Sequence, residues 1–217
     1  MNNKVLLLLI AFLLPVLVAI GQKPFIEGTI KYKVTFEAAD NKAYNGTYTF
    51  TFKNGQIRKE LKLTNGFQDI VLINTNNNTI YSLRNKNGKM FAIQLSMEEM
   101  TERQKQYKGY SITEETGKEK MFAGKKGIKS LVRYKNGMSS ELYLNKDWYA
   151  EKSIAFERFP DARFIPLMYS YKDDARGFSM QMEVESISEE PVENSMFRIP
   201  EDYRIISNEE YKQLSRQ

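Results

Sequence analysis

The 217-residue sequence contains no cysteine and no histidine. Their absence excludes disulfide bonds, thiolate or imidazole metal sites, and catalysis of the Ser-His-Asp or Cys-His type. Any catalysis would have to use carboxylates, Lys, Tyr, Ser or Thr. With 41% apolar and 27% charged residues, the composition is that of a globular protein. We therefore expect a fold that is stabilised by its hydrophobic core alone.

The sequence also lacks long apolar runs, except at its N-terminus. Lys4 precedes an apolar stretch over residues 5–20, and small residues occupy the −3 and −1 positions of a cleavage after Gly21. This pattern predicts a secretory signal peptide over 1–21, because the stretch is short for an uncleaved membrane anchor, which is the alternative. The mature chain, 22–217, is then a single domain whose net charge falls from +5 to +4 with the loss of Lys4. We expect an exported protein in the periplasm, with the extracellular space as the alternative location.

The dipeptide Asn-Gly is frequent in the sequence. Asn-Gly favours the positive φ angles of the type I′ turns that join antiparallel strands. It occurs five times, at 45–46, 54–55, 65–66, 87–88 and 136–137. The chain is therefore predicted to be a series of β-hairpins.

Between these turns, apolar and polar residues alternate as they do in half-buried strands. Ile30, Tyr32, Val34 and Phe36 share one face, and Tyr48, Phe50 and Phe52 share the face of the next strand. Further strands are predicted at 56–63, 68–74, 79–84, 89–95, 110–116, 126–135, 138–145, 164–172 and 177–188. The last of these places Phe178, Met180, Met182 and Val184 on one face. So many short strands indicate one large antiparallel sheet whose apolar face needs a cover.

Two helical stretches could supply that cover. Ser96 and Glu99 form a capping box, after which Met97 and Met100 begin an apolar stripe that extends to about residue 108. A second helix is expected around 147–159, a stretch that contains the single tryptophan, Trp148. A short C-terminal helix is expected from Asn208.

The C-terminal half resembles a widespread family of exported Gram-negative proteins that is classed as a domain of unknown function. The resemblance is carried by Gly117–Gly137 with the strand and turn Glu141–Asp147, by Ile165–Ser170, and by the closing phrase Pro191–Tyr203, which contains Phe197-Arg-Ile-Pro-Glu-Asp-Tyr203. It extends in pattern over roughly residues 25 to 206.

This family is similar to the periplasmic lipoprotein carrier LolA and its relatives. The resemblance implies a mostly β (α+β) fold: a single curved antiparallel sheet that forms an open half-barrel, with about two helices covering the concave face. It also implies an apolar, lipid-compatible cavity on that face. Met-rich helices suit such a surface, because methionine adapts its shape to what it packs against.

The candidate ligand-binding residues are the apolar side chains expected on the concave face. They are Tyr32, Val34, Phe36, Phe50, Phe52, Met97, Met100, Trp148, Met180 and Met182. Two interpretations remain open for them. Either these side chains fill the core completely beneath fixed helices, or they leave a cavity able to admit an acyl chain. No cofactor and no metal ion is expected.

Other function classes have weaker support. The carboxylates of the sequence, such as Glu98, Asp161 and Asp173, fall in predicted loops or on an exposed helix face, so we expect no enzyme and no catalytic residue. Nucleic acid is not an expected partner of an exported chain whose lysines alternate along strands. The basic strand from Lys125 to Lys135 is predicted to be a solvated face, and a transient contact with anionic lipid headgroups is the alternative.

The sequence thus predicts a non-catalytic periplasmic binding protein, a carrier of a lipid, an acyl chain or a lipoprotein in the concave apolar cavity. The alternative is an interaction module of the cell envelope with a solid core and no small-molecule ligand, in which loops such as 74–79 or 146–163 bind a partner protein.

Overall fold

The computed structural model describes residues 22–40, 42–173 and 177–216, so the predicted signal peptide lies outside the described residues. Twelve strands form the main sheet. They are β2 (Glu27–Glu37), β3 (Ala43–Lys53), β4 (Gln56–Leu63), β5 (Gln68–Asn74), β6 (Thr79–Lys86), β7 (Lys89–Leu95), β8 (Ser111–Phe122), β9 (Lys125–Arg133), β10 (Ser139–Asn145), β12 (Ile165–Asp173), β13 (Phe178–Ser188) and β14 (Arg204–Ser207).

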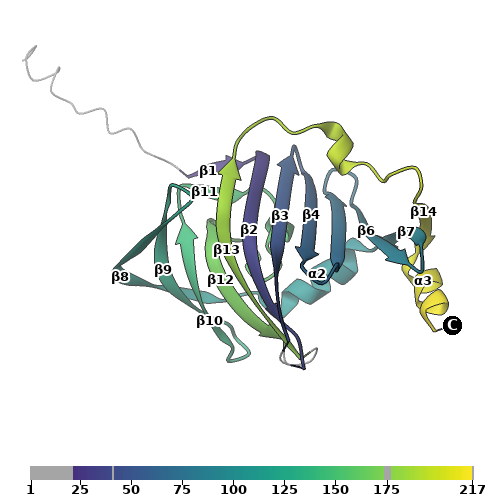
Figure 1. The fold of residues 1–217 in the computed structure, drawn as a ribbon. Helices are drawn as coiled ribbons and strands as arrows, with labels where there is room; N and C mark the ends of the chain where they lie inside the picture. The colour runs from purple at the N-terminus through teal and green to yellow at the C-terminus, as the bar shows by residue number, and fades with distance from the viewer. Residues whose placement is uncertain (1–21, 41, 174–176, 217) are drawn as a thin grey trace, which may run out of the picture.

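The sheet is strongly curved and open (Figure 1). Its strand order is β14-β7-β6-β5-β4-β3-β2-β13-β12-β10-β9-β8, and β14 and β8 are its two free edges in the described chain. All pairs are antiparallel except β14 with β7, which run parallel. The predicted class, a single curved antiparallel sheet in an open half-barrel, is therefore confirmed.

Four of the five Asn-Gly pairs form hairpin turns, as predicted. In the turns β3–β4 and β6–β7 both residues have positive φ, with 46° and 80° at Asn54 and Gly55. Asn45-Gly46 is the exception, because it lies inside β3. Gly46 is needed there for close approach rather than for a turn, since a Cβ atom on it would lie 2.0 Å from the carbonyl oxygen of Lys62 on β4.

We expect Gly46→Ala to lower the free energy of unfolding by about 2 kcal/mol, because the added methyl group would push β3 and β4 apart. Urea denaturation of the variant measures this loss. Asn45→Ala, an exposed position one residue earlier in the same strand, is the control and should change stability by less than about 0.5 kcal/mol. Equal stability of the two variants would contradict the close approach.

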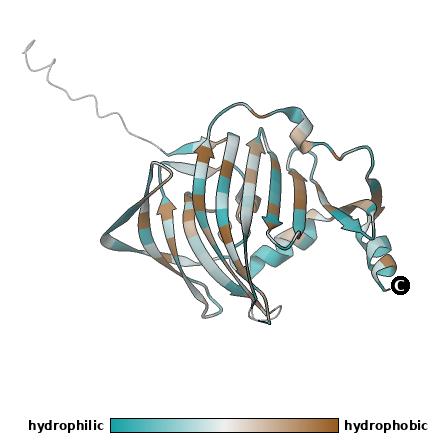
Figure 2. Cartoon of the chain, viewed as in Figure 1, coloured by the Kyte–Doolittle hydropathy of each residue, from teal (hydrophilic) through white to brown (hydrophobic). Residues whose placement is uncertain are grey.

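The main core lies on the concave side of the sheet. The apolar positions alternate with polar ones along each strand (Figure 2), and on β2 the residues Ile30, Tyr32 and Val34 are almost completely buried. The Tyr32 hydroxyl donates a 2.8 Å hydrogen bond to the carbonyl oxygen of Pro166, which satisfies its polar atom inside the core.

Two α-helices pack on the sheet, α2 on its concave side and α3 at its edge against β7 and β14 (Figure 1). The first, α2 (Met97–Lys105), begins at Ser96, whose hydroxyl accepts a hydrogen bond from the Glu99 amide at 3.0 Å. The second, α3 (Asn208–Ser215), has a complete capping box formed by Ser207 and Glu210. Both starting points match the sequence, because the capping residues act locally.

The helix expected at 147–159 is wrong. Trp148–Ala150 is instead a strand, β11, which pairs in parallel with β1 (Lys23–Phe25) in a separate two-stranded sheet. After it the chain makes one short 3-10 helix, η1 (Ser153–Ala155), and an irregular stretch to residue 164. The distant strand β1 provides hydrogen-bond partners for the backbone of β11, in place of the hydrogen bonds that a helix would have formed within itself. The sequence pattern did not reveal this pairing.

The C-terminal segment also departs from a simple hairpin series. From β13 it crosses over the strand ends through the 3-10 helix η2 (Asn194–Phe197) and reaches β14 at the far edge (Figure 1). Ile199 and Tyr203 cover a small second core on the convex face, formed by Ile70, Leu72, Leu83 and Ala92. On the concave face, Tyr211 and Leu214 of α3 pack against Phe91, Ile93 and Ile206.

Candidate functional site

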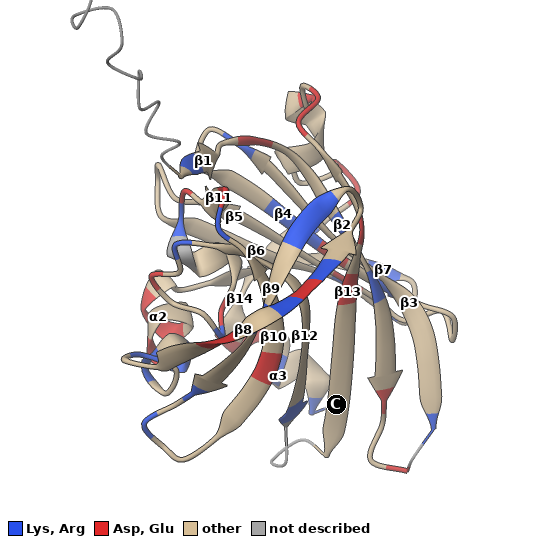
Figure 3. Ribbon diagram, turned by 90° about the vertical axis from the view of Figure 1, so that its left-hand side faces the viewer, with Lys and Arg blue, Asp and Glu red and all other residues tan. Residues whose placement is uncertain are grey.

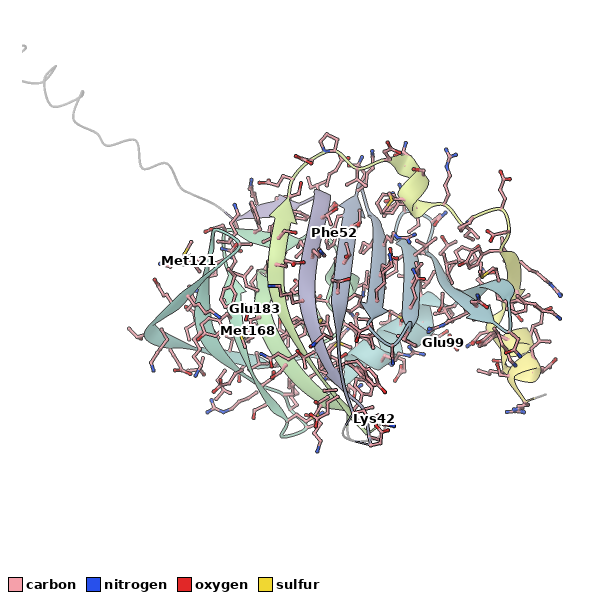
Figure 4. The ribbon with its side chains drawn as sticks, viewed as in Figure 1. Lys42, Phe52, Glu99, Met121, Met168 and Glu183 are labelled. Carbon is pink, nitrogen blue, oxygen red and sulfur yellow. The ribbon has the colours of Figure 1, made fainter. Side chains whose placement is uncertain are left out.

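The trough formed by the curved sheet is filled at one end. Phe52 marks this end in Figure 4. Its ring lies 5.4 Å from that of Phe25, which in turn lies 5.6 Å from Trp148. All three side chains are buried, so this end is a packed aromatic core.

The irregular segment 151–164 fills the middle of the trough. Phe156 stacks on Phe50 of β3 with 5.2 Å between the ring centroids. Phe159 meets Tyr169 of β12 at 5.2 Å and Phe164 at 5.6 Å. This segment takes the place that the predicted second helix was expected to occupy on the sheet.

The other end of the trough is hollow. It lies near the β2–β3 turn, where Figure 4 marks Lys42. A cavity of about 470 Å³ that opens to solvent lies there between the inner face of the sheet, α2 and Glu157. Its apolar wall consists of Phe36, Tyr48, Leu61, Leu63, Phe67, Val71, Leu95, Met100, Tyr171, Phe178 and Met180. A second cavity of about 160 Å³, beneath Tyr107 and Phe156, shares Tyr48, Lys59, Arg103, Glu157, Tyr171 and Phe178 with the first.

Lys59 stands where the two cavities meet. It lies on the inner face of β4, between Phe50 of β3 and Val71 of β5 in the strand register, and only 6% of its surface is exposed. Its Nζ atom donates a 3.0 Å hydrogen bond to the carbonyl oxygen of Ile154 and lies 5.7 Å from the centre of the Phe50 ring. Burial lowers the pKa of Lys59 from its ordinary 10.5 to about 8, and the more distant charges of Glu157 and Asp69 partly oppose this.

Three of the other charged groups of the cavities have partners of their own. Arg84 Nη1 lies 2.7 Å from Asp69 Oδ1, an ion pair without hydrogen-bond alignment. Burial raises the pKa of Asp69, while Arg84 and Lys59 act to lower it. The guanidinium of Arg158 stacks over Tyr171 at 3.6 Å. Together with Arg103 and Glu157, the two cavities hold four cations against two carboxylates.

The structure distributes the ten predicted ligand-binding residues over four environments. Phe36, Met100 and Met180 line the larger cavity, and Phe50 and Met182 line the smaller one. Met97 lines a separate surface groove of about 430 Å³ beside Tyr149 and Arg163. The remaining four, Tyr32, Val34, Phe52 and Trp148, belong to the packed core.

The sequence reasoning did not single out Lys59. A signal was present, since Ile57, Lys59, Leu61 and Leu63 occupy the same phase of the predicted strand 56–63, so the lysine falls on the apolar face. A charged residue at such a position is a better pointer to a site than the apolar residues around it, because buried charges are rare.

The basic strand β9 does not form an unopposed positive surface. Lys126 pairs with Glu119 at 2.7 Å, and Lys129 lies 3.1 Å from Glu115 and 3.3 Å from Glu141. Lys and Arg are interspersed with Asp and Glu along the strands (Figure 3). Within the described ranges, the acidic side chains form no group of three that could hold a metal ion. No helix in the described part of the chain has the length and apolar character needed to cross a bilayer.

No protein-family model and no curated protein matches the sequence. Among solved structures, the chain is similar to an uncharacterized conserved protein from Thermus thermophilus, with a TM-score of 0.50 and 11% identity over 85% of this chain and 93% of the other. It also matches MucB of Pseudomonas aeruginosa in its complex with MucA, with a TM-score of 0.45 and 9% identity, over 84% of this chain and 59% of the other. A LolA superfamily protein, NE2245 from Nitrosomonas europaea, matches with a TM-score of 0.38 and 9% identity over 82% and 92% of the two chains.

At these identities the similarity concerns the fold alone. The expected architecture, one open, curved sheet with helices packed on it, is confirmed by the structure itself. The function has to be argued from the cavity.

Proposed function

We propose that the protein is a non-catalytic binding protein of the periplasm that shelters an acyl chain, free or on a lipid or lipoprotein, in the hollow end of its trough. The observation that carries this proposal is the cavity of about 470 Å³ beneath α2. Sites for small apolar ligands typically have about 300 to 1,000 Å³.

The chemistry of the cavity wall supports an apolar ligand. Side chains such as Leu61, Val71 and Met100 would remove the methylene groups of a bound chain from water, at about 0.8 kcal/mol for each group buried. The wall can also adapt, since Met100 lies on a helix of only nine residues and Met180 also lines the cavity. We assign binding rather than catalysis because one of the two carboxylates, Asp69, is already paired with Arg84.

Organic extraction of the protein purified from its native envelope, followed by mass spectrometry, tests this function. We expect lipid or fatty-acyl species in the extract of the wild type. Absence of bound lipid, combined with failure to take up a neutral acyl probe from solution, would contradict the proposal.

Filling the cavity should abolish this binding. Val71 lies on the inner face of β5 and lines the cavity, so the indole ring of Val71→Trp would occupy the space of the ligand. We expect at least a tenfold loss of affinity for a neutral acyl probe, measured by fluorescence titration. Ile205→Trp, at an exposed position on β14 outside the cavity, is the control and should bind as the wild type does. Full binding by Val71→Trp would show that the ligand lies elsewhere.

A second candidate function is supported by the free edge of the sheet. The strand β8 is twelve residues long, is largely exposed, and carries Met121 with 62% of its surface accessible. An unpaired edge of this length can accept a strand from a partner protein. A photo-crosslinking residue at Met121, activated in the intact envelope, separates the candidates. An interaction module should give one discrete protein adduct, whereas a carrier should give none or several lipidated ones.

A further inference from the structure

We propose that the ligand of this cavity is a single-chain amphiphile with an anionic head, and that Lys59 binds the head while the hollow end of the trough holds the chain. This inference rests on the proposed function and adds the chemical class of the ligand. It is carried by the position of a buried, incompletely paired ammonium group in the wall of a cavity that apolar side chains line in part.

The geometry of Lys59 leaves donors free for a ligand. An ammonium group has three N–H donors, and the carbonyl oxygen of Ile154 accepts one of them. The face of the Phe50 ring provides a weak second contact at 5.7 Å. No described carboxylate forms an ion pair with Nζ, since Glu157 and Asp69 act on it only at longer range. A buried cation in this state is costly, and an anion placed beside it would offset that cost.

The placement of Lys59 also suits an amphiphile. It lines both cavities, so a head bound at Nζ would sit at their junction, and a chain could extend along Leu61, Val71 and Met100 toward the opening. The surrounding charge favours an anion, with Arg84, Arg103 and Arg158 outnumbering Asp69 and Glu157. A ligand without a charged head would leave this ammonium group uncompensated.

A purely structural role for Lys59 is the competing explanation. Its hydrogen bond to Ile154 fixes the segment 151–164 over the sheet, and a loss of that bond would affect any ligand equally. Selectivity between heads therefore distinguishes the two roles, because only a head-binding residue discriminates an anion from a neutral group on the same chain.

The experiment measures displacement of a neutral fluorescent acyl probe from the purified protein by hexadecanol, hexadecanoate and hexadecyl phosphate at pH 7. We expect the wild type to bind at least one anion about tenfold or more tighter than the alcohol, and the stronger anion identifies the head as carboxylate or phosphate. Lys59→Met should remove this preference and keep the binding of hexadecanol. Lys62→Met, the same substitution on the exposed face of β4, should keep the preference.

A pH series on the wild type provides a second measurement that needs no variant. The affinity for hexadecanoate should fall between pH 7 and pH 10 as Lys59 loses its proton, while that for hexadecanol stays constant. The other titratable and charged groups that line the two cavities with Lys59 are Tyr107, Tyr48 of β3, Asp69 of β5, Arg84 of β6, Arg103 of α2, Glu157 and Arg158 of the irregular segment, and Tyr169 and Tyr171 of β12. Burial raises the pKa of Tyr48 and so keeps it neutral throughout this range.

The possible results separate a failure of the anionic-head inference from a failure of the proposed function. Equal binding of alcohol and anions by the wild type, or a preference that survives in Lys59→Met, would overturn the anionic-head inference and leave the acyl-binding function standing. Failure of all three compounds and of the probe to bind would overturn the proposed function and the inference with it.

Discussion

Truncating Phe159 to alanine is expected to lower the free energy of unfolding by about 4 kcal/mol, the largest effect of any single substitution considered for this protein. Phe159 is 1% exposed and is among the largest fully buried side chains. Its ring touches those of Tyr110, Phe164 and Tyr169 at centroid distances between 5.2 and 6.4 Å. The variant would lose this burial and leave a cavity that the rigid sheet cannot close.

The size of this effect follows from where Phe159 lies. The segment 151–164 has few backbone hydrogen bonds of regular structure, so side chains such as Phe156 and Phe159 hold it in the trough. Urea denaturation followed by tryptophan fluorescence measures the loss. Phe67→Ala, the same substitution at a position that is 46% exposed, is the matched control and should cost less than about 1 kcal/mol. A loss for Phe159→Ala as small as that of the control would mean that the segment is not packed into the sheet.

Replacing Lys59 with methionine is expected to raise the free energy of unfolding, whereas Phe159→Ala lowers it. At pH 7 the variant should be more stable than the wild type by about 2 kcal/mol, because it removes a buried ammonium group with little change in shape. The difference between the pKa of Lys59 in the folded protein and its ordinary value corresponds to a gain in stability of about 3 kcal/mol when the charge is removed. The loss of the hydrogen bond to Ile154 offsets part of this gain. Lys62→Met on the exposed face of the same strand should be neutral within about 0.5 kcal/mol.

The stability of the wild type should depend on pH in a matching way. The pKa of Lys59 is about 8 in the folded state and 10.5 when unperturbed, so between these values the unfolded chain binds the proton and the folded chain does not. The contribution of this group therefore rises with pH across the window from 8 to 10.5 and is least favourable below 8. The stabilities of the wild type and Lys59→Met should accordingly converge as pH rises from 8, and near pH 10.5 the wild type should be the more stable of the two because it keeps the hydrogen bond to Ile154. A constant difference across this window would show that Lys59 is not desolvated in the fold.

Both Lys59 predictions concern the same group and are linked. A residue that destabilises the fold and yet faces a cavity is typical of a binding site, because such sites sacrifice stability for function. If Lys59→Met is more stable and loses its selectivity for anions, the two results together show that the buried charge destabilises the fold and that it binds the anionic head of the ligand.

Much of the fold could be predicted from local patterns. The alternation on β2, β3 and β13 gave the correct inner faces, and the capping residue Ser96 gave the correct start of α2. The helix expected from Asn208 also begins there. These signals are local, since the period of a strand and the hydrogen bonds of a cap involve neighbouring residues only. The same local reasoning failed at Asn45-Gly46, where a turn dipeptide lies in a strand because the neighbouring backbone of β4 approaches it closely.

The amino-acid sequence by itself determined that most Asn-Gly pairs close hairpins, which face of β2, β3 and β13 is buried, and the chemistry that is excluded by the absence of cysteine and histidine. Only the tertiary structure decided that residues 147–164 form β11 and an aromatic plug instead of a helix, because their partners β1 and Phe50 are distant in the chain. It also decided where the trough stays hollow. Empty volume depends on how side chains from many strands meet, which no local pattern encodes. For the same reason the sequence shows Lys59 as one lysine among many, and the fold makes it a buried charge in the wall of a cavity.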